Sequence, residues 1–345
     1  MLTIDEALTL IQQTLAPSPA VALPLVQCLG LTLAEDIISA IESPPFDKAL
    51  MDGYAVCASD VATGQATLTV LERITAGMTP QQTVRAGFAT QIMTGAPLPA
   101  GADAVVRIED TREDGDRVVI NSAPVTVGQD LIRKGAALRI GETVLIRGMA
   151  LTPSRIGALA ELGVATPMVH PRPTVAVLAT GDELVPVDQM PGPGQIRNSN
   201  ESMLVAQLQS YGVNTQPLGI ARDDRAELAS RIEAGLQADV LVLSGGVSAG
   251  KLDLVPSTLA AAGVEQVFHK VDLKPGKPIW FGVKKRPDGA ACAVFGLPGN
   301  PVSSMVCCEL FVRTALRRLM GQREARPLAE AARLTHPYRM QSDRP

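Results

Sequence analysis

The pattern of apolar residues changes near Pro171, and this change limits the possible fold more than any other feature of the sequence. Beyond that point, short apolar runs alternate with amphipathic helical segments, which is the order of elements in a parallel α/β domain. The clearest buried strands are predicted at residues 175–179, 240–243 and 292–297. We therefore expect an α/β domain in the second half of the chain.

Capping residues mark where several helices begin. Thr3 followed by Glu6 is a capping box, and apolar residues at helical spacing after it predict an amphipathic first helix. Asp224 predicts the start of another helix. Asn300, directly before a proline, predicts the start of a third that runs to about Met320.

The first half of the chain has a different composition. Residues 23–151 are rich in Gly, Pro, Thr and Val, and short apolar runs at 68–71 and 118–120 favour small β-rich units. The proline-rich stretch 167–173 is typical of a linker. Because 345 residues exceed the size at which one hydrophobic core stops growing, we expect several domains.

Composition and charge exclude several classes of protein. Hydrophobic residues make up 46% and charged residues 19%, as in ordinary globular proteins. A net charge of −4 gives no general attraction to nucleic acid or to an anionic membrane. The chain opens with acidic residues where a signal peptide needs basic ones, and its five cysteines form no CxxC pair. We expect a cytoplasmic protein that binds neither nucleic acid nor membrane.

Loops rich in small residues follow each predicted strand of the α/β domain. In open α/β sheets ligands bind at this carboxyl edge, where small residues let the backbone approach a phosphate. Asp182, Glu183 and Asp253 have the oxygen ligands that a hard cation prefers, so a phosphorylated substrate with Mg²⁺ is predicted. Any one of these loops, taken alone, is also consistent with a simple strand-to-helix turn. They occupy residues 180–184, 244–253 and 296–301.

Residues 245–251 also fit the GxxxxGK pattern of a phosphate-binding P-loop. The next residue is Leu252, whereas a P-loop has a serine or threonine there as a magnesium ligand. The sequence therefore argues against a P-loop NTPase.

Basic residues gather near residue 270. Lys270, Asp272 and Lys274 alternate along a predicted strand and would share one face, and Lys277 follows across a Pro-Gly turn. Three ammonium groups on one side suit a polyanionic substrate, although a solvated edge strand protected by lysines explains the segment equally well.

The histidines and cysteines do not predict a catalytic pair or a metal centre. His170, His269 and His336 lie in unrelated contexts without metal-ligand spacing, and we expect them to be structural or exposed. Cys307 and Cys308 lie among apolar residues in a predicted helix and are interpreted as core packing.

Seven motifs carry a resemblance to a known family. The segment FDKALMDGYAV at 46–56 resembles the MDGYA signature of the molybdopterin molybdenumtransferase family of MoeA and gephyrin type. The other motifs match that family in the same order and cover essentially the whole chain. They are IMTGAPLPAGADAVV at 92–106, TGDEL at 180–184, GQIRNSN at 194–200, SGGVS at 244–248, KPGKP at 274–278 and LPGNPVS at 297–303.

The resemblance implies an α/β and β multidomain fold: a MogA-like three-layer α/β domain with an elongated N-terminal region that carries a β-rich lid domain. The implied boundaries are an N-terminal helical and linker domain at 1–44 and 133–170, the lid at 45–132, the MogA-like molybdopterin-binding domain at 171–325, and the start of a truncated C-terminal β domain at 326–345.

The activity implied by the resemblance is the insertion of molybdate into adenylylated molybdopterin, with release of AMP, in an Mg²⁺-dependent homodimer whose active cleft lies between subunits. A MogA-like adenylyltransferase and molybdoenzyme chaperones are the implied partners. A scaffold that clusters receptors, as gephyrin-type chains do, and a MogA-like adenylyltransferase are the alternatives. The adenylyltransferase would not need the first 170 residues.

Motif by motif, the resemblance also implies the residues of the site. The catalytic ones would be Asp52, Thr94, Glu183, Asp223, Asp253, Lys270 and Lys274, with Glu183 and Asp253 at the metal. The substrate-binding ones would be Gly181, Asp182, Ser199, Asn200, Gly245, Gly246, Ser248, Lys277, Pro298, Gly299, Asn300, Pro301 and Ser303.

The sequence departs from the family pattern at three places. Ala49 and Leu50 precede Met51 where the family usually has a serine, so one polar contact is expected to be missing. Alanines follow Gly135 where acidic residues are common, and the chain stops at Pro345, just after the family's C-terminal domain would begin.

Overall fold

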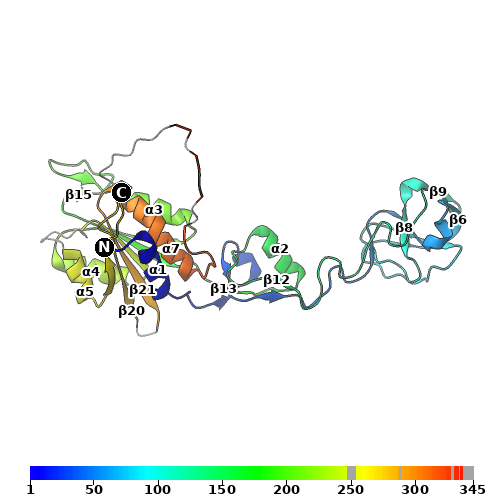
Figure 1. The fold of residues 1–345 in the computed structure, drawn as a ribbon, viewed down its shortest axis with the longest axis horizontal. Helices are drawn as coiled ribbons and strands as arrows, with labels where there is room; N and C mark the ends of the chain where they lie inside the picture. The colour runs from blue at the N-terminus through cyan, green and yellow to red at the C-terminus, as the bar shows by residue number, and fades with distance from the viewer. Residues whose placement is uncertain (247–253, 287–288, 328–329, 334, 337–345) are drawn as a thin grey trace. The chain divides into compact units, whose positions relative to one another are not determined.

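The computed structural model describes residues 1–246, 254–286, 289–327, 330–333 and 335–336 (Figure 1). It divides into two compact units. The first joins Met1–Asp36 to Ile146–Pro345, and the second is Ile37–Leu145. No helix among the described residues is both long enough and apolar enough to cross a membrane.

The first unit is built around a six-stranded sheet in the order β17-β14-β18-β21-β20-β19. The first four strands in this order are parallel, and β20 runs antiparallel to both of its neighbours. The three strands predicted most clearly are confirmed as β14, β18 and β21. The strand bounds are β14 Thr174–Thr180, β17 Asn214–Ala221, β18 Val240–Ser244, β19 Glu265–His269, β20 Trp280–Lys285 and β21 Ala291–Leu297.

Helices cover both faces of this sheet, so the domain has the predicted three layers (Figure 1). Val175 and Val177 of β14 pack with α1, α3 and the helix after β21, whereas Ala176 and Leu178 pack with α4 and α5. Successive residues of a strand point to opposite faces, so a strand buried on both sides must be apolar throughout. The helix bounds are α1 Ile4–Thr14, α3 Ser199–Ser210, α4 Arg225–Gly235 and α5 Leu254–Ala261.

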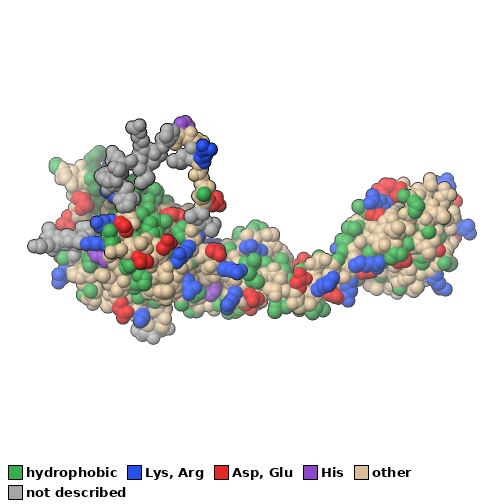
Figure 2. Space-filling view, viewed as in Figure 1, with side chains coloured by type: hydrophobic (Ala, Val, Ile, Leu, Met, Phe, Trp, Pro, Cys, Tyr) green, Lys and Arg blue, Asp and Glu red, His purple; other side chains and the backbone are tan. Residues whose placement is uncertain are grey.

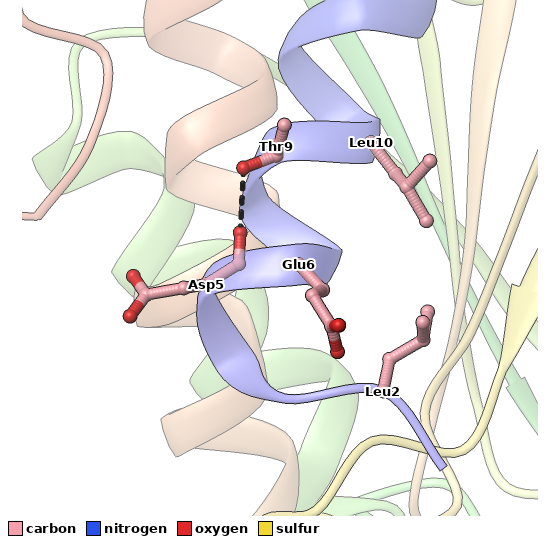
Figure 3. A pocket seen from close by; sticks show the side chains of 5 residues that line it. All are labelled: Leu2, Asp5, Glu6, Thr9 and Leu10. Carbon is pink, nitrogen blue, oxygen red and sulfur yellow. Dashed lines mark hydrogen bonds between the residues drawn. The ribbon is translucent and has the colours of Figure 1, made fainter.

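The first helix, α1, confirms the predicted capping box. The Thr3 hydroxyl accepts a hydrogen bond from the Glu6 backbone N–H at 3.2 Å, and the Glu6 carboxylate accepts one from the Thr3 N–H at 2.7 Å. Its buried face carries Leu8 and Ile11. On its outer side, Leu2 and Leu10 border a hollow of about 380 Å³ (Figure 3).

The last long helix begins at the predicted position, with the Asn300 side chain as its cap. It runs as α6 (Pro301–Cys307), a π-helical turn (Cys308–Val312) and α7 (Arg313–Leu319). The sequence did not predict the π-helical turn. Cys307 and Cys308 are fully buried, as predicted, and burial raises the pKa of the Cys307 thiol to about 12.

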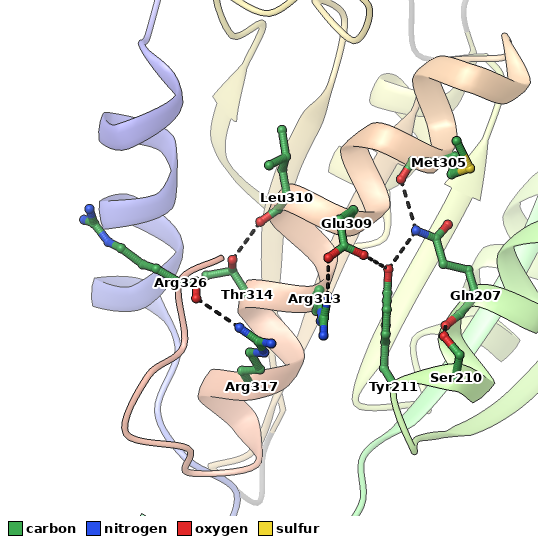
Figure 4. Close-up of polar contacts among 10 residues, drawn as sticks. All are labelled: Gln207, Ser210, Tyr211, Met305, Glu309, Leu310, Arg313, Thr314, Arg317 and Arg326. Atoms are coloured by element: carbon green, nitrogen blue, oxygen red, sulfur yellow. Dashed lines mark hydrogen bonds and ion pairs between the residues drawn. The ribbon is translucent and has the colours of Figure 1, made fainter. Parts of the chain in front are cut away.

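Polar side chains join α3 to this helix (Figure 4). Glu309 in the π-helical turn accepts hydrogen bonds from the Tyr211 hydroxyl, at 2.5 Å, and from the Arg313 guanidinium. Arg313 also lies over the Tyr211 ring, 4.8 Å from its centroid. Gln207 donates to the Tyr211 hydroxyl at 2.7 Å. Burial and the bond to Glu309 raise the pKa of Tyr211, so the ring stays a neutral donor.

A small sheet precedes the α/β domain in the same unit. It has the order β1-β13-β2, with helix α2 close in sequence. Thr152 caps α2 and Pro153 is its first residue, which is a favoured helix start. The elements are β1 Val21–Ala22, a 3-10 turn at Leu25–Gln27, β2 Thr32–Leu33, α2 Pro153–Glu161 and β13 Met168–His170.

The second unit contains another six-stranded sheet, in the order β8-β5-β7-β6-β10-β9. The apolar runs at 68–71 and 118–120 lie in β6 and β10, as predicted, and the buried residues of its largest cluster include Tyr54, Leu68 and Val118. The strands of this sheet are β5 Gly53–Val56, β6 Gln65–Ile74, β7 Phe88–Ile92, β8 Ala104–Arg107, β9 Thr111–Asp114 and β10 Arg117–Asn121. Two short pairs lie outside it: β3 Ile37–Ile38 pairs with β12 Thr143–Leu145, and β4 Lys48–Ala49 pairs with β11 Leu131–Ile132.

One predicted strand is wrong. Strand β19 ends at His269, and Lys270 has a φ of +72°, a left-handed conformation that does not continue a strand. Val271 donates its backbone N–H to the carbonyl of Lys277 at 3.1 Å, so residues 270–277 fold into a loop. Lys270, Asp272 and Lys274 therefore do not alternate along one strand.

Candidate functional site

The predicted loops meet at the carboxyl edge of the α/β sheet. Strands β14, β18 and β21 are parallel neighbours and end at Thr180, Ser244 and Leu297. The Thr180 hydroxyl donates to the Ser244 carbonyl at 3.4 Å, and the Gly245 N–H donates to the Leu297 carbonyl at 3.1 Å. The chain therefore leaves three adjacent strands at one place, where α/β proteins bind their ligands.

Asn200 ties two of these loops to helix α3. Its side-chain Nδ2 donates to the Ser244 hydroxyl at 2.8 Å and to the Gly299 carbonyl at 2.8 Å. Its Oδ1 is buried and has no hydrogen-bond partner in the described part of the chain. An unpaired buried acceptor is costly, so its oxygen is suited to accept a donor from a ligand.

The two glycines after β18 are required by close packing. A Cβ on Gly245 would lie 2.6 Å from the Thr180 carbonyl oxygen, and one on Gly246 would lie 2.7 Å from a methyl of Val255. Both also have positive φ, +94° and +64°. Larger residues would push this loop away from the sheet, which explains why the SGG sequence is found here.

The loop after β21 is fixed by its own side chains. The Asn300 Oδ1 accepts from the backbone N–H groups of Val302 and Ser303, at 3.0 and 3.2 Å. The Ser304 hydroxyl donates to the carbonyl of Pro298, which is buried. Within the predicted LPGNPVS motif, Asn300 therefore shapes the loop, and its oxygen is already used by the helix.

The acidic residues lie on the loops after β14 and β17. Asp182 Oδ1 accepts from the Asp223 backbone N–H at 3.0 Å, and Arg222 donates to the carbonyls of Asp182 and Leu184 at 2.8 and 2.9 Å. The carboxylate of Glu183 folds back beside its own loop, because a Cβ built on Gly181 would lie 2.4 Å from one of its oxygens.

These acids do not by themselves complete a metal site. Among the residues that the structure describes, no group of three or more His, Cys, Asp or Glu is arranged to hold a metal ion. The predicted residues Ser248 and Asp253 lie outside the described residues. The predicted pairing of Glu183 with Asp253 at a metal stays a prediction.

The lysine loop lies at the same edge of the sheet as the other loops. His269 at the end of β19 pairs with Trp280, which pairs with Gly296 near the end of β21, so residues 270–279 follow that edge. The loop rests on the long helix, because the Cys307 thiol donates to the carbonyl of Gly276 at 3.6 Å. Lys274 and Lys277 of this loop are exposed.

Asp52 and Thr94 form a separate group in the second unit. Asp52 Oδ1 accepts two hydrogen bonds, from the backbone N–H and from the hydroxyl of Thr94, each at 2.7 Å. The first of these bonds, with help from the second, lowers the pKa of the Asp52 carboxyl below its ordinary value. Gly53 beside it admits no side chain, since a Cβ would lie 1.9 Å from the Val106 carbonyl oxygen.

The structure thus brings together most of the predicted residues in two groups. The loops of residues 180–184, 244–246, 270–277 and 297–301 share one edge of the first unit with Asn200, while Asp52 and Thr94 are neighbours in the second. Sequence reasoning missed Ser244 and Arg222 as contacts that hold the loops. Ser244 is the first residue of the SGGVS motif and Arg222 directly precedes the predicted site residue Asp223, which was the available signal.

Two family models match the chain. The model described as the MoeA N-terminal region (domain I and II) matches residues 2–163, and the probable molybdopterin binding domain matches residues 176–318. The second match contains the sheet edge at which the loops converge. The fold and the site therefore define a protein of molybdenum cofactor biosynthesis.

Individual relatives agree with this class. A protein of Mycobacterium tuberculosis named molybdopterin molybdenumtransferase 2 is 37% identical over 93% of this chain and 80% of its own length, and a molybdopterin molybdenumtransferase of Synechococcus elongatus is 33% identical over 96% and 85%. The solved structure of the molybdopterin biosynthesis MoeA protein from Pyrococcus horikosii is similar, with a TM-score of 0.78 and 34% identity over 93% of this chain and 81% of that one. The chain belongs to the molybdopterin molybdenumtransferase (MoeA) family.

Proposed function

We propose that this protein inserts molybdate into adenylylated molybdopterin and releases AMP, which makes it a transferase of molybdenum cofactor biosynthesis. The observation that carries the proposal is the convergence of three loops at the carboxyl edge of one sheet, tied together by Asn200. The family membership of the chain supports the choice of substrate.

The described residues suggest how the substrate is held. The loop that begins at Gly245 leaves the sheet at its carboxyl edge, where α/β proteins bind phosphates, and the buried Oδ1 of Asn200 accepts a hydrogen bond from a donor group of the ligand. Lys274 and Lys277, both exposed on the neighbouring loop, neutralise negative charge that develops on phosphate and oxyanion. Bound in this way, the phosphoanhydride and molybdate are placed next to each other, which lowers the entropic part of the barrier.

Magnesium belongs to the same proposal, with Glu183 and Asp253 as its protein ligands. The described acids form no complete ligand group, so we assign no step of the reaction to the ion. The role of Glu183 can be tested by substitution, because its carboxylate is exposed on the loop after β14. Its amide variant keeps the shape of the side chain and removes one charge.

The decisive experiment incubates the protein with adenylylated molybdopterin, molybdate and Mg²⁺ and follows AMP release. Release that depends on molybdate is the expected result. AMP release or ATP consumption that does not depend on molybdate contradicts the proposal and favours an adenylyltransferase. That alternative does not explain residues 2–163, which match the MoeA N-terminal region. Glu183→Gln is expected to lower turnover and worsen the Mg²⁺ requirement, whereas the exposed acid Asp188, changed to Asn, serves as a control that leaves both unchanged.

A homodimer with a shared cleft is also part of the proposal. Asp52 and Thr94 belong to a different unit from the other site residues, and we propose that they act on a site built by the α/β domain of the partner subunit. Mixed dimers of Asp52→Asn and Glu183→Gln chains are then expected to recover one intact site per dimer. A mixture with no recovered activity would contradict a shared cleft.

We propose the cytoplasm as the site of action, because all five cysteines are free thiols, which suits a reducing compartment. The enzyme that adenylylates molybdopterin and the chaperones of molybdoenzymes are the proposed protein partners. The domain boundaries at 44, 132, 170 and 325 stay predictions.

A further inference from the structure

A second cavity lies in the first unit, away from the sheet edge just described. It has a volume of about 710 Å³, and segments far apart in the sequence contribute to its walls. Small-molecule sites in proteins usually measure about 300–1,000 Å³. The residues that line it are Pro17, Leu33, Ala34, Asp36, Ile146, Arg147, Gly148, His170, Arg318, Gly321, Gln322 and Arg323.

The position of this cavity separates it from the candidate active site. The long helix begins with the Asn300 cap at the carboxyl edge of the sheet and ends at Leu319, 18 residues after Pro301, which at 1.5 Å per residue is about 27 Å away. The cavity lies at this far end, where α7 approaches His170 of strand β13. Figure 2 shows Arg and Lys side chains on the surface in this region. A ligand bound here therefore does not touch the loops of the candidate site.

The cavity carries an excess of positive charge in a chain that is acidic as a whole. Arg147, Arg318 and Arg323 face one carboxylate, that of Asp36, so three positive charges and one negative charge sum to +2, whereas the chain has a net charge of −4. Like charges that share a cavity repel each other unless an opposite charge lies between them. This arrangement is stabilised when an anion binds.

Most of these guanidinium groups have no other role in the described structure. The side chains of Arg147 and Arg323 make no hydrogen bond or ion pair to any described residue, and Asp36 binds the Arg147 backbone N–H at 2.7 Å instead of its side chain. Arg318 uses only its Nε, which donates to the Leu15 carbonyl at 2.9 Å. The dipole of α7 attracts cations to its last turn, which accounts for Arg318, but it does not account for Arg147.

Close backbone contacts hold the walls of the cavity in place. A Cβ on Gly321 would lie 2.2 Å from the His170 ring, and one on Gly148 would lie 3.2 Å from the Arg323 Cβ. The His170 Nδ1 lies 2.7 Å from the Ser18 carbonyl, which fixes the ring against the wall. The backbone at Gly148 and Gly321 and the His170 ring therefore form a packed frame from which the arginines project.

We propose that this cavity binds a small phosphate monoester, with Arg147, Arg318 and Arg323 around the phosphate. A net charge of +2 matches a phosphate dianion, and planar guanidinium groups bind phosphate oxygens through paired hydrogen bonds. The volume exceeds what a bare phosphate fills, and the Gln322 amide and the His170 ring supply hydrogen-bonding groups for the organic part.

The test measures binding of glycerol 3-phosphate to the full chain by isothermal titration calorimetry, with uncharged glycerol as the reference ligand. We expect binding of glycerol 3-phosphate, none of glycerol, and affinity at least tenfold weaker in the Arg147→Gln, Arg323→Gln double variant. Glutamine keeps much of the aliphatic stem, and the side chains it replaces make no polar contacts to described residues, so the fold is expected to persist. Thermal unfolding of the ligand-free variant verifies this. Arg139→Gln, an exposed arginine of the other unit, is the matched control and is expected to bind like the parent.

A Lys274→Gln variant distinguishes this cavity from the candidate active site. Binding that survives this change and is lost in the double variant supports the proposal. Binding that is lost with Lys274 and unaffected in the double variant overturns it, as does equal affinity in all variants. Because no turnover is measured, the outcome does not depend on the proposed transferase activity.

Discussion

Asn200 offers a sharp test of how the candidate site is built. In Asn200→Ala, the hydrogen bonds to the Ser244 hydroxyl and to the Gly299 carbonyl are both lost, while the N-cap of α3 at Asn198 is kept. The two bonds join helix α3 to the loops after β18 and β21. Their loss is expected to affect both the stability of the first unit and the position of its loops.

The magnitude follows from the two bonds. Each hydrogen bond contributes about 1 kcal/mol net, so Asn200→Ala is expected to cost about 2 kcal/mol. For a unit of this size, a change of 1 kcal/mol shifts the melting temperature by roughly 2–4 °C, which predicts a fall of about 4–8 °C. The Asn200 Oδ1 lacks a partner among the described residues, and removing it offsets part of this cost.

Differential scanning calorimetry measures this shift, and AMP release measures the effect on the site. Asn214→Ala is the matched control, because Asn214 is exposed at the start of β17 and its side chain makes no hydrogen bond to any described residue. Ser244→Ala, combined with Asn200→Ala in a double-mutant cycle, isolates the contact between these two side chains. If Asn200→Ala has the melting temperature and the rate of AMP release of the parent, the two hydrogen bonds do not hold the loops and the reasoning is refuted.

Three further predictions concern other parts of the chain. Gly53→Ala places a methyl group against the Val106 carbonyl, so the second unit is expected to lose about 1–3 kcal/mol in calorimetry, and an unchanged transition would contradict the packing. Thr94→Val removes one hydrogen bond to Asp52 and is expected to raise the pKa of the Asp52 carboxyl in an NMR titration. In the parent, the lowered pKa of Asp52 contributes stability that is fully present above the ordinary pKa of an aspartate and is lost as the pH falls through the pKa of the folded state. Cys57, the only partly exposed cysteine, is expected to react with a thiol reagent at pH 8 well before the four buried ones, and equal rates would count against the burial of those four.

The fold was predictable where one local rule determined the element. Strands buried on both faces, such as β14, need continuous apolar runs, and caps such as Thr3 and Asn300 need particular side chains at one position. The prediction of a strand through residues 270, 272 and 274 was wrong, because alternating charged residues do not fix a strand unless one of its faces is buried. Its conformation is set instead by contacts of residues 271 and 276 with distant parts of the chain.

The candidate site was predictable as a set of motifs, and less so as a set of contacts. The residues in the loops were named correctly as neighbours because parallel strands end at one edge. The sequence gives no sign that Asn300 uses its oxygen on its own helix or that Asn200 links two loops, since both follow from tertiary distances. The π-helical turn at Cys308–Val312 was unpredictable for the same reason.

The close packing of the glycine loop limits what substitutions can show about binding. Gly245 and Gly246 are small because Thr180 and Val255 leave no room for a side chain, so the fold alone accounts for them. An alanine at either position would move the loop whether or not a phosphate binds there, and lost activity would not identify a ligand contact. Exposed charged side chains give a cleaner answer, because Lys277→Gln changes the charge with little effect on packing. If Lys277 contacts the substrate, the variant raises KM or lowers kcat while its melting temperature stays that of the parent. A variant unchanged in all three quantities would remove Lys277 from the site and leave the packing argument intact.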